Sequence, residues 1–263
     1  MDMYEWIDPL RFLLCLIFLL IASIYDVRTR EVPNWVWAFF APIGLALTFT
    51  SLAVDGWSHQ RITMLVISAF LTICLSLALF YIGMFGGADA KALMCLAAAM
   101  PIYPEKFELV TKILLPMPPI STFNNAVLIA SLLTIANSFR NLIDLIKYKG
   151  RIFEGLEDDR LLKKIAAFIT GFRVDAAKIL YEKHYYILLE EFSRGEDGRL
   201  IRSLKILRSL NDEKREEKLI PEEFSGKVWV TMGLPFLAFI TLGFLISFFF
   251  GDIIFWLIVT AVR

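Results

Sequence analysis

Long apolar stretches alternate with short polar breaks along this chain of 263 residues. A helix that crosses the hydrocarbon layer of a membrane needs roughly 20 mostly apolar residues. The apolar stretches predict six such helices, at residues 10–27, 34–54, 62–84, 89–104, 120–147 and 228–250. The fourth is short. An apolar tail after Gly251 and Asp252 either continues the last helix or lies in the membrane interface.

Charged residues gather between the fifth and sixth predicted helices. Here EGLEDDRLLKKIAAFITGF begins as an amphipathic helix, and HYYILLEEF and RLIRSLKIL, separated by the turn residues SRGEDG, predict a β-hairpin. We therefore expect an all-α polytopic membrane protein of about six transmembrane helices, with a small α+β soluble insert before the last helix. Residues 1–147 would hold five helices, 148–226 the insert, and 227–263 the last helix and the tail.

Composition supports a membrane protein and narrows the choice of partners. Hydrophobic residues make up 57% of the chain, against about 45–50% in soluble domains, so the lipid bilayer is an expected partner. The net charge of zero lacks the basic excess of a nucleic-acid binder. Three cysteines lie in apolar stretches without a CxxC pair, and His59 and His184 are far apart in the predicted topology. We expect no metal and no cofactor, and the oligomeric state is open.

Basic residues predict which ends of the helices face the cytoplasm. Arg28 and Arg30 follow the first helix, Lys91 opens the fourth, and most other lysines and arginines lie in the insert. Cytoplasmic loops of membrane proteins carry an excess of Lys and Arg. With six helices these three regions share one side, so the insert is expected in the cytoplasm.

Four aspartates lie at the ends of predicted membrane helices, where a carboxylate is costly and often functional. Asp26 ends the first helix, and Asp89 follows Gly86 and Gly87 at the start of the fourth. Both are predicted at the cytoplasmic edge, so they can meet. Asp144 shares that side but has Lys147 one turn away, and Asp252 falls on the opposite side.

The residues alone leave several interpretations of Asp26 and Asp89 open. Ion pairs with Arg28 and Lys91 at the membrane interface are the most ordinary, because helix-edge charges reach water at little cost. A small transporter or channel can use such acids to bind cations or protons, and in a scaffold protein they are incidental. Two aspartates that share a partly dry site would instead form the dyad of an aspartyl protease, one charged and one protonated.

Three motifs resemble those of type IV prepilin peptidases, and they occur in the family's order. YDVRTREVPNW runs from Tyr25 to Trp35, GMFGGADAKALM from Gly83 to Met94, and GLPFLAFITLG from Gly233 to Gly243. The second is similar to the GxGD motif, with Ala88 in place of its second glycine. The subgroup most similar to this chain is the archaeal preflagellin peptidases, which have six helices and a soluble insert before the last one.

The resemblance implies an aspartyl endopeptidase of the cell membrane with Asp26 and Asp89 as the catalytic pair at the cytoplasmic edge. It also implies that Gly86, Gly87 and Pro235 contact the substrate. The family's substrates are preflagellin and other pilin-like precursors, which carry a short basic leader, a small residue at the cut and an apolar helix. Another GxGD protease, of the presenilin or signal peptide peptidase type, is an alternative, although the place of Asp26 on the first helix argues against it. Four acids of the insert either attract the leader or form a solvated face: Asp158, Asp159, Glu190 and Glu191.

Overall fold

The chain divides into two units, each described here by itself. The computed structural model describes residues 6–104, 115–181, 186–194, 200–205, 220–221, 224–232 and 235–262. The first unit, called the helical unit below, comprises Met1–Ala130 and Pro235–Arg263, and the second, the insert unit, comprises Ser131–Leu234. Each unit has hydrophobic clusters of its own.

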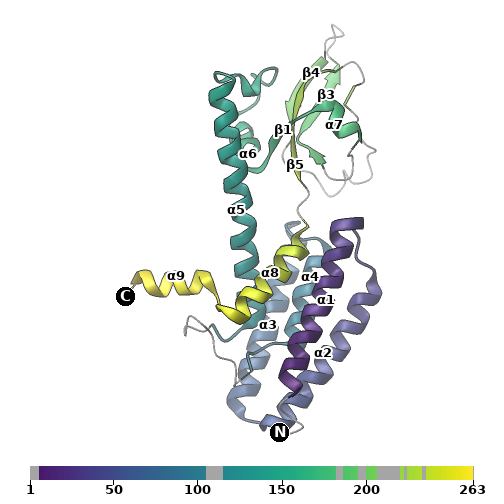
Figure 1. Ribbon diagram of the computed structural model, residues 1–263, viewed down its shortest axis with the longest axis vertical. Coiled ribbons are helices and arrows are strands. Elements are labelled where there is room, and N and C mark those ends of the chain that lie inside the picture. Colours follow the sequence, from purple (N-terminus) through teal and green to yellow (C-terminus); the bar gives the residue numbers. More distant parts are fainter. Residues whose placement is uncertain are drawn as a thin grey trace. The chain divides into compact units, whose positions relative to one another are not determined.

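Helices build all of the regular structure that is described in the helical unit (Figure 1). They are α1 (Ile7–Thr29), α2 (Asn34–Asp55), α3 (His59–Tyr81), α4 (Gly87–Ala99), the first part of α5 (Pro118–Lys147), α8 (Phe236–Phe249) and α9 (Ile253–Val262). The short helix α4 packs against α1, α2, α3 and α8. Most of its residues are buried, so it forms the centre of this unit.

The long helices of the chain have the length and composition of membrane spans. Four of them qualify, namely α1, α2, α3 and α5, and the bent pair α8 and α9 makes a fifth if it counts as one span. The protein is therefore a mostly helical, multi-pass membrane protein. The predicted number of about six spans is not confirmed. Helix α4 has 13 residues, or about 20 Å at 1.5 Å per residue, which is short of the roughly 30 Å hydrocarbon layer.

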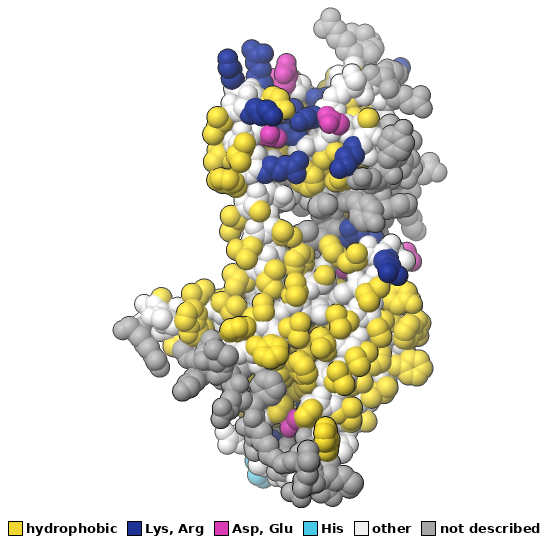
Figure 2. All heavy atoms as spheres, viewed as in Figure 1, with side chains coloured by type: hydrophobic (Ala, Val, Ile, Leu, Met, Phe, Trp, Pro, Cys, Tyr) yellow, Lys and Arg dark blue, Asp and Glu magenta, His cyan; other side chains and the backbone are white. Residues whose placement is uncertain are grey.

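Helix α1 shows how a membrane helix divides its surface between lipid and protein. Leu13, Ile17 and Leu20 are exposed, whereas Cys15 and Leu19 on the other side are fully buried. Exposed hydrophobic side chains cover much of the visible face of the helical unit in Figure 2. In water such a surface would be unfavourable, and in a bilayer it is the expected lipid-facing surface.

The last predicted helix differs from the observed structure at both ends. Residues 228–232 belong to a β-strand, Lys227–Met232, and the helix begins only at Phe236, with Pro235 as its N-cap. At the other end the chain bends by 51° between α8 and α9. Buried Asp252 caps α9 by accepting from the backbone of Phe255, and it also accepts from Asn124 at 2.7 Å. The tail therefore does not continue the last helix in a straight line.

The insert unit combines helices with two small antiparallel sheets. Besides the end of α5 it contains the 3-10 helix η2 (Arg151–Phe153), α6 (Leu161–Thr170) and α7 (Ala176–Tyr181). The strands β1 (Phe172–Asp175), β5 (Lys227–Met232) and β2 (Tyr186–Leu188) form one sheet in that order. The predicted hairpin is confirmed in part as the other sheet, in which β3 (Glu190–Arg194) pairs with β4 (Leu200–Leu204), whereas β2 of the same predicted strand pairs with β5 instead. Buried Trp229 of β5 stacks on Phe153 at 4.9 Å between ring centroids.

Candidate active site

Asp26 lies in the last turn of α1, where the chain is about to leave the helix. The helix ends at Arg30, which adopts a left-handed conformation with φ of 60° and donates its backbone N–H to the carbonyl of Asp26. The side chain of Asp26 is partly buried and accepts a hydrogen bond from the backbone N–H of Leu237. Because Leu237 is the second residue of α8, the carboxylate lies at the positive N-terminal end of that helix.

Asp89 lies at the N-terminal end of another helix, α4. It is the third residue of α4, and its Oδ2 accepts the backbone N–H of Gly86, the N-cap residue, at 3.1 Å. This contact is half of a capping box and fixes the side chain at the N-terminal end of α4. Asp89 is also partly buried. Both aspartates thus accept a backbone N–H at a helix N-terminus, a contact that by itself favours a carboxylate.

The two aspartates come together although 63 positions separate them in the sequence. Helices α1, α4 and α8 pack against one another in pairs, and Asp89 lies within electrostatic range of Asp26. The positive charge of Arg30 also acts on Asp26. The site therefore contains two neighbouring carboxyl groups from separate helices, each with polar partners of its own.

The two glycines before Asp89 differ in how much space a β-carbon would have at each position. Gly86 has an extended conformation with φ of −69°, which other residues adopt readily. A β-carbon added there would lie 3.2 Å from Oδ2 of Asp89, whereas one at Gly87 would meet only a ring carbon of Phe80 at 3.8 Å. Gly86 is therefore needed for space beside the carboxylate. Ala88, which replaces the second glycine of the GxGD motif, lies within α4 and needs no glycine conformation.

Side chains from the three motifs contact one another and connect α4 to α2 and α8. Lys91, one residue beyond Ala90 in α4, donates to Oδ1 of Asn34 at the start of α2 over 2.8 Å. Phe85 contacts Phe236, at 5.2 Å between ring centroids, so the residue before Gly86 meets the residue after Pro235. Neither contact was predicted. The signal for both was present, because all four residues lie inside the recognised motifs.

Acids outside the pair have structural roles or separate locations. Asp252 is fully buried and bound to Asn124, and Asp144 belongs to the insert unit. In that unit Asp159 accepts the backbone N–H of Leu204 at 2.7 Å and pairs with Lys163. Such contacts leave Asp159 little freedom to attract a basic leader.

Glu190 is a buried structural acid rather than part of an acidic surface. Its two oxygens accept from Nε and Nη2 of Arg202 at 2.9 and 3.0 Å, and Oε1 also accepts the backbone N–H of Trp229. Burial raises the pKa of Glu190, although the Trp229 N–H and Arg202 act in the opposite direction. Of the four acids considered for leader attraction, Asp158 is exposed and Glu191 is partly exposed, with Lys205 4.0 Å away.

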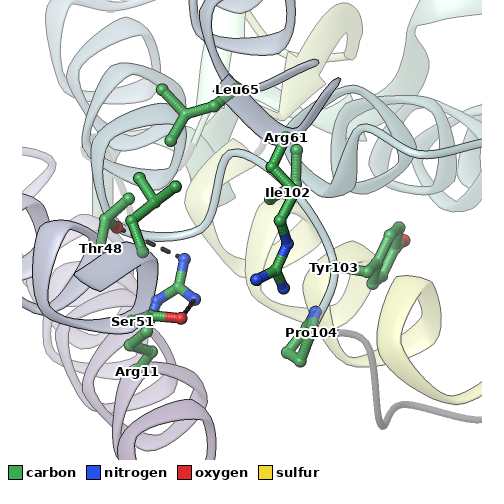
Figure 3. Close-up of a pocket in the computed structure, with 9 residues that line it drawn as sticks. Arg11, Thr48, Ser51, Arg61, Leu65, Ile102, Tyr103 and Pro104 are labelled. Atoms are coloured by element: carbon green, nitrogen blue, oxygen red, sulfur yellow. Dashed lines mark hydrogen bonds between the residues drawn. The ribbon is translucent and has the colours of Figure 1, made fainter. Parts of the chain in front are cut away.

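A second polar cluster of the helical unit lies near the other end of α1. Arg11 is buried and donates to Asp8, Ser51, Thr48 and the carbonyl of Ala99. It lines a cavity of about 10 Å³ (Figure 3), which has room for about one water molecule. Fifteen residues of helix, or about 22 Å, separate Arg11 from Asp26. This cluster is therefore a structural polar contact, apart from the aspartate pair.

Metal-binding residues do not gather anywhere in the described part of the chain. No group of three or more His, Cys, Asp or Glu side chains within residues 6–262, apart from the gaps given above, has the arrangement of a metal site. His59 is exposed at the start of α3, and His184 lies outside the described residues.

Comparison with known proteins assigns both parts of the chain to one group. Residues 13–136 match the type IV leader peptidase family, and residues 163–253 match the type II C-terminal region of archaeal A24 peptidases. The preflagellin peptidase of Methanococcus voltae is 30% identical over 242 residues, which cover 90% of this chain and 93% of that protein. Those of Methanocaldococcus jannaschii and Methanococcus maripaludis are 26% and 27% identical, over 92% and 89% of this chain and 94% and 92% of their own lengths.

The matched regions include every residue of the aspartate pair and its surroundings. Asp26, Asn34, Asp89 and Lys91 fall within the match to the leader peptidase family, and Pro235 and Phe236 within the match to the C-terminal region. The resemblance that the motifs suggested is therefore confirmed over almost the whole length of the chain. The chain belongs to the type IV leader peptidase family, alongside the preflagellin peptidases.

Proposed function

We propose that this protein is an aspartic endopeptidase that removes the leader from preflagellin or another pilin-like precursor, with Asp26 and Asp89 as its catalytic pair. One observation carries the catalytic part: Asp26 and Asp89 lie within electrostatic range of each other, each at a helix N-terminus. The family and the names of its preflagellin peptidase relatives support the substrate.

Two carboxyl groups suffice for hydrolysis of a peptide bond. In the reactive state one aspartate is charged and takes a proton from a water molecule, which attacks the carbonyl carbon of the substrate. The other is protonated and donates a hydrogen bond to the carbonyl oxygen, where negative charge develops. Neighbouring carboxyl groups favour this division, because the charge on one opposes the ionisation of the other.

The surroundings of the pair suit an extended substrate that enters at the membrane edge. Gly87 is exposed, and a β-carbon there would make only an ordinary contact, 3.8 Å from a ring carbon of Phe80. Pro235 begins α8 beside Leu237, whose N–H binds Asp26. We infer that Gly86 and Gly87 on one side and the Pro235 turn on the other contact the substrate backbone. Arg28, Arg30 and Lys91 favour a cytoplasmic position for this end of the unit.

The test is a cleavage assay with purified protein and a preflagellin precursor in detergent. Wild type, Asp26→Asn and Asp89→Asn are compared, with thermal unfolding as the check that each variant is folded. We expect cleavage by wild type alone, and loss of at least 10³-fold in either variant because one carboxyl group cannot do both tasks. Arg28→Gln, which replaces a neighbouring charged side chain by an amide, is the control near Asp26, and it should retain cleavage.

The assay also separates the proposal from its alternatives. A precursor with a bulky residue in place of the small residue before the cut should resist cleavage, because the family recognises that position. Full activity of a folded Asp26→Asn or Asp89→Asn protein would remove that residue from the mechanism. Flux of protons or cations through vesicles that depends on both aspartates, without proteolysis, would favour a transporter instead.

A further inference from the structure

The insert unit contains a cavity whose lining is strongly basic. Its volume is about 350 Å³, within the range of small-molecule sites. Four cationic side chains line it together with one acid and one amide: Arg140, Arg173, Lys178, Lys227, Asp175 and Asn137. They come from α5, β1, α7 and β5. Among the described residues of the lining, cations outnumber acids by four to one, so the wall favours an anion.

Both arginines of the cavity lie over aromatic rings, and Arg173 is also within electrostatic range of Glu190, an acid that is already hydrogen-bonded to Arg202. The guanidinium of Arg140 lies over the ring of Phe172 at 5.0 Å, and that of Arg173 lies over Tyr148 at 5.3 Å. Nη1 of Arg173 is buried and has no hydrogen-bond acceptor in the part of the chain that the structure describes. Buried donors of a guanidinium almost always have acceptors, so an anion from outside the protein would complete this site.

Lys227 contributes a further positive charge to the cavity, and its contact is with Tyr148 rather than with an acid. Its Nζ donates to the hydroxyl of Tyr148 at 3.2 Å and lies 5.3 Å from the centre of that ring. Tyr148 therefore orders both Lys227 and Arg173. A planar guanidinium binds two oxygens of a phosphate at once, and an ammonium adds a point charge beside it. The lining thus has the chemistry of a phosphate site.

The position of the cavity along α5 indicates where such a phosphate would come from. The 22 residues from Pro118 to Arg140 rise about 33 Å, close to the roughly 30 Å thickness of the hydrocarbon layer. Next to Arg140, the apolar side chains of Phe139 and Ile143 are exposed, as expected for lipid-facing positions. If the span begins at Pro118, it ends near Arg140, at the depth of lipid headgroups.

We propose that this cavity binds the phosphate of an anionic lipid headgroup. Arg140 and Arg173 hold the phosphate oxygens, Lys227 and Lys178 add positive charge, and the amide of Asn137 supplies a neutral donor. The bound lipid joins α5 to β1 and β5 and orders the insert unit at the membrane surface. A basic substrate leader cannot take this place, because it carries the same sign of charge as the wall.

The test measures binding of tail-labelled phosphatidylglycerol to the full-length protein in a neutral detergent. The double variant Arg140→Gln/Arg173→Gln should lose at least tenfold in affinity, since both guanidinium groups form charge-assisted hydrogen bonds with the phosphate. The matched control is Lys149→Gln/Arg151→Gln, which removes two exposed charges of the same unit outside the cavity. It should bind within about twofold of wild type. Phosphatidylcholine should bind weakly to all of these proteins.

Two single variants test the proposal even if the double variant unfolds. Arg140 is exposed on α5, so Arg140→Gln should fold and still bind several-fold more weakly. Asp175→Asn removes the only acid from the described lining, so it should bind phosphatidylglycerol about two- to threefold more tightly. If Arg140→Gln and Asp175→Asn each bind phosphatidylglycerol with the affinity of wild type, the proposal is overturned.

Competition distinguishes the lipid from other anions. Inorganic phosphate should displace the labelled lipid only at far higher concentration, because it lacks the acyl chains that α5 holds at this depth. Equal potency of inorganic phosphate would overturn the lipid assignment in favour of a soluble phosphate site. Stronger displacement by an acidic peptide than by phosphatidylglycerol would overturn it in favour of a polypeptide partner.

Discussion

The space left by Gly86 sets the geometry of Asp89, and adding one methyl group there tests it. A β-carbon at residue 86 would lie 3.2 Å from Oδ2 of Asp89, so the carboxylate must shift by a few tenths of an ångström. We expect Gly86→Ala to lower kcat on the order of tenfold, because small misplacements of reacting groups are costly. The unfolding temperature should change little, since the backbone at residue 86 is extended.

Gly87→Ala is the informative comparison with Gly86→Ala. The added carbon there meets only Phe80 at 3.8 Å, an ordinary contact, so the position of Asp89 is undisturbed. If Gly87 contacts the substrate backbone, this variant should raise KM and leave kcat nearly unchanged. Steady-state cleavage kinetics separate the two constants, and a fall in kcat equal to that of Gly86→Ala would contradict the distinction.

Glu190 should make the insert unit respond to pH in the direction opposite to an ordinary salt bridge. Burial raises the pKa of this carboxyl group in the folded state, so the folded state binds the proton more strongly than the unfolded state does. The contribution of this group to the free energy of unfolding is therefore fully present below the unfolded pKa. It is lost as the pH rises through the folded pKa.

The measurement is a carbon NMR titration of the Glu190 carboxyl group, with thermal unfolding of the full chain at several pH values. The titration midpoint should lie above that of an exposed glutamate. The stability of wild type relative to Glu190→Gln should increase as the pH falls through that midpoint. A midpoint below the ordinary glutamate value would show that Arg202 outweighs burial, and the pH dependence would then reverse.

At the scale of whole elements, length and hydropathy were enough to predict the long helices and not enough for the others. Helix α4 is apolar because protein surrounds it, and a buried helix has the same composition as one in lipid. The strand Lys227–Met232 leads almost directly to α8, and its residues from Val228 onward are mostly apolar, as those of the helix are. Periodicity cannot separate the two in so short an apolar run, which is why the predicted span began at 228.

The candidate site could be predicted to a similar degree. Placing Asp26 and Asp89 on the same side of the membrane was enough to predict that they can meet, because both stand at helix ends beside basic loops. The contact between the backbone N–H of Leu237 and Asp26 could not be predicted, because a backbone N–H has no signature in the sequence. The burial of Glu190 was also missed, because its partners, Arg202 and Trp229, come from two other strands.

Close packing of α8 on α5 depends on a glycine of the third motif. A β-carbon at Gly243 would collide with the carbonyl of Thr122 and lie 2.8 Å from the backbone nitrogen of Ala126. Because backbone atoms cannot move aside cheaply, Gly243→Ala should destabilise the helical unit by about 1–3 kcal/mol. The check is the unfolding temperature in detergent. Leu242→Val, at an exposed position of the same helix, is the control and should have a much smaller effect.

At the scale of the whole molecule, the proposed function requires the aspartate pair to face the cytoplasm. Helix α2 has 22 residues, about 33 Å, so its two ends should lie on opposite sides of the membrane. Glu31 precedes α2 and Trp57 follows it, and both are exposed. Glu31→Cys and Trp57→Cys therefore report on the two sides, with a membrane-impermeant maleimide as the probe and the parent chain as the control.

The orientation of α2 decides on which side the substrate is cut. Glu31 is five residues from Asp26 in the chain, so the side on which Glu31→Cys reacts is the side of the catalytic pair. We expect it to react in inside-out vesicles and Trp57→Cys to react in intact cells, because Arg28 and Arg30 favour the cytoplasm. Reaction of both from one side would contradict α2 as a membrane span. The reverse pattern would place the pair outside the cell, where a basic leader retained in the cytoplasm cannot reach it, and the proposed peptidase reaction would fail on topology alone.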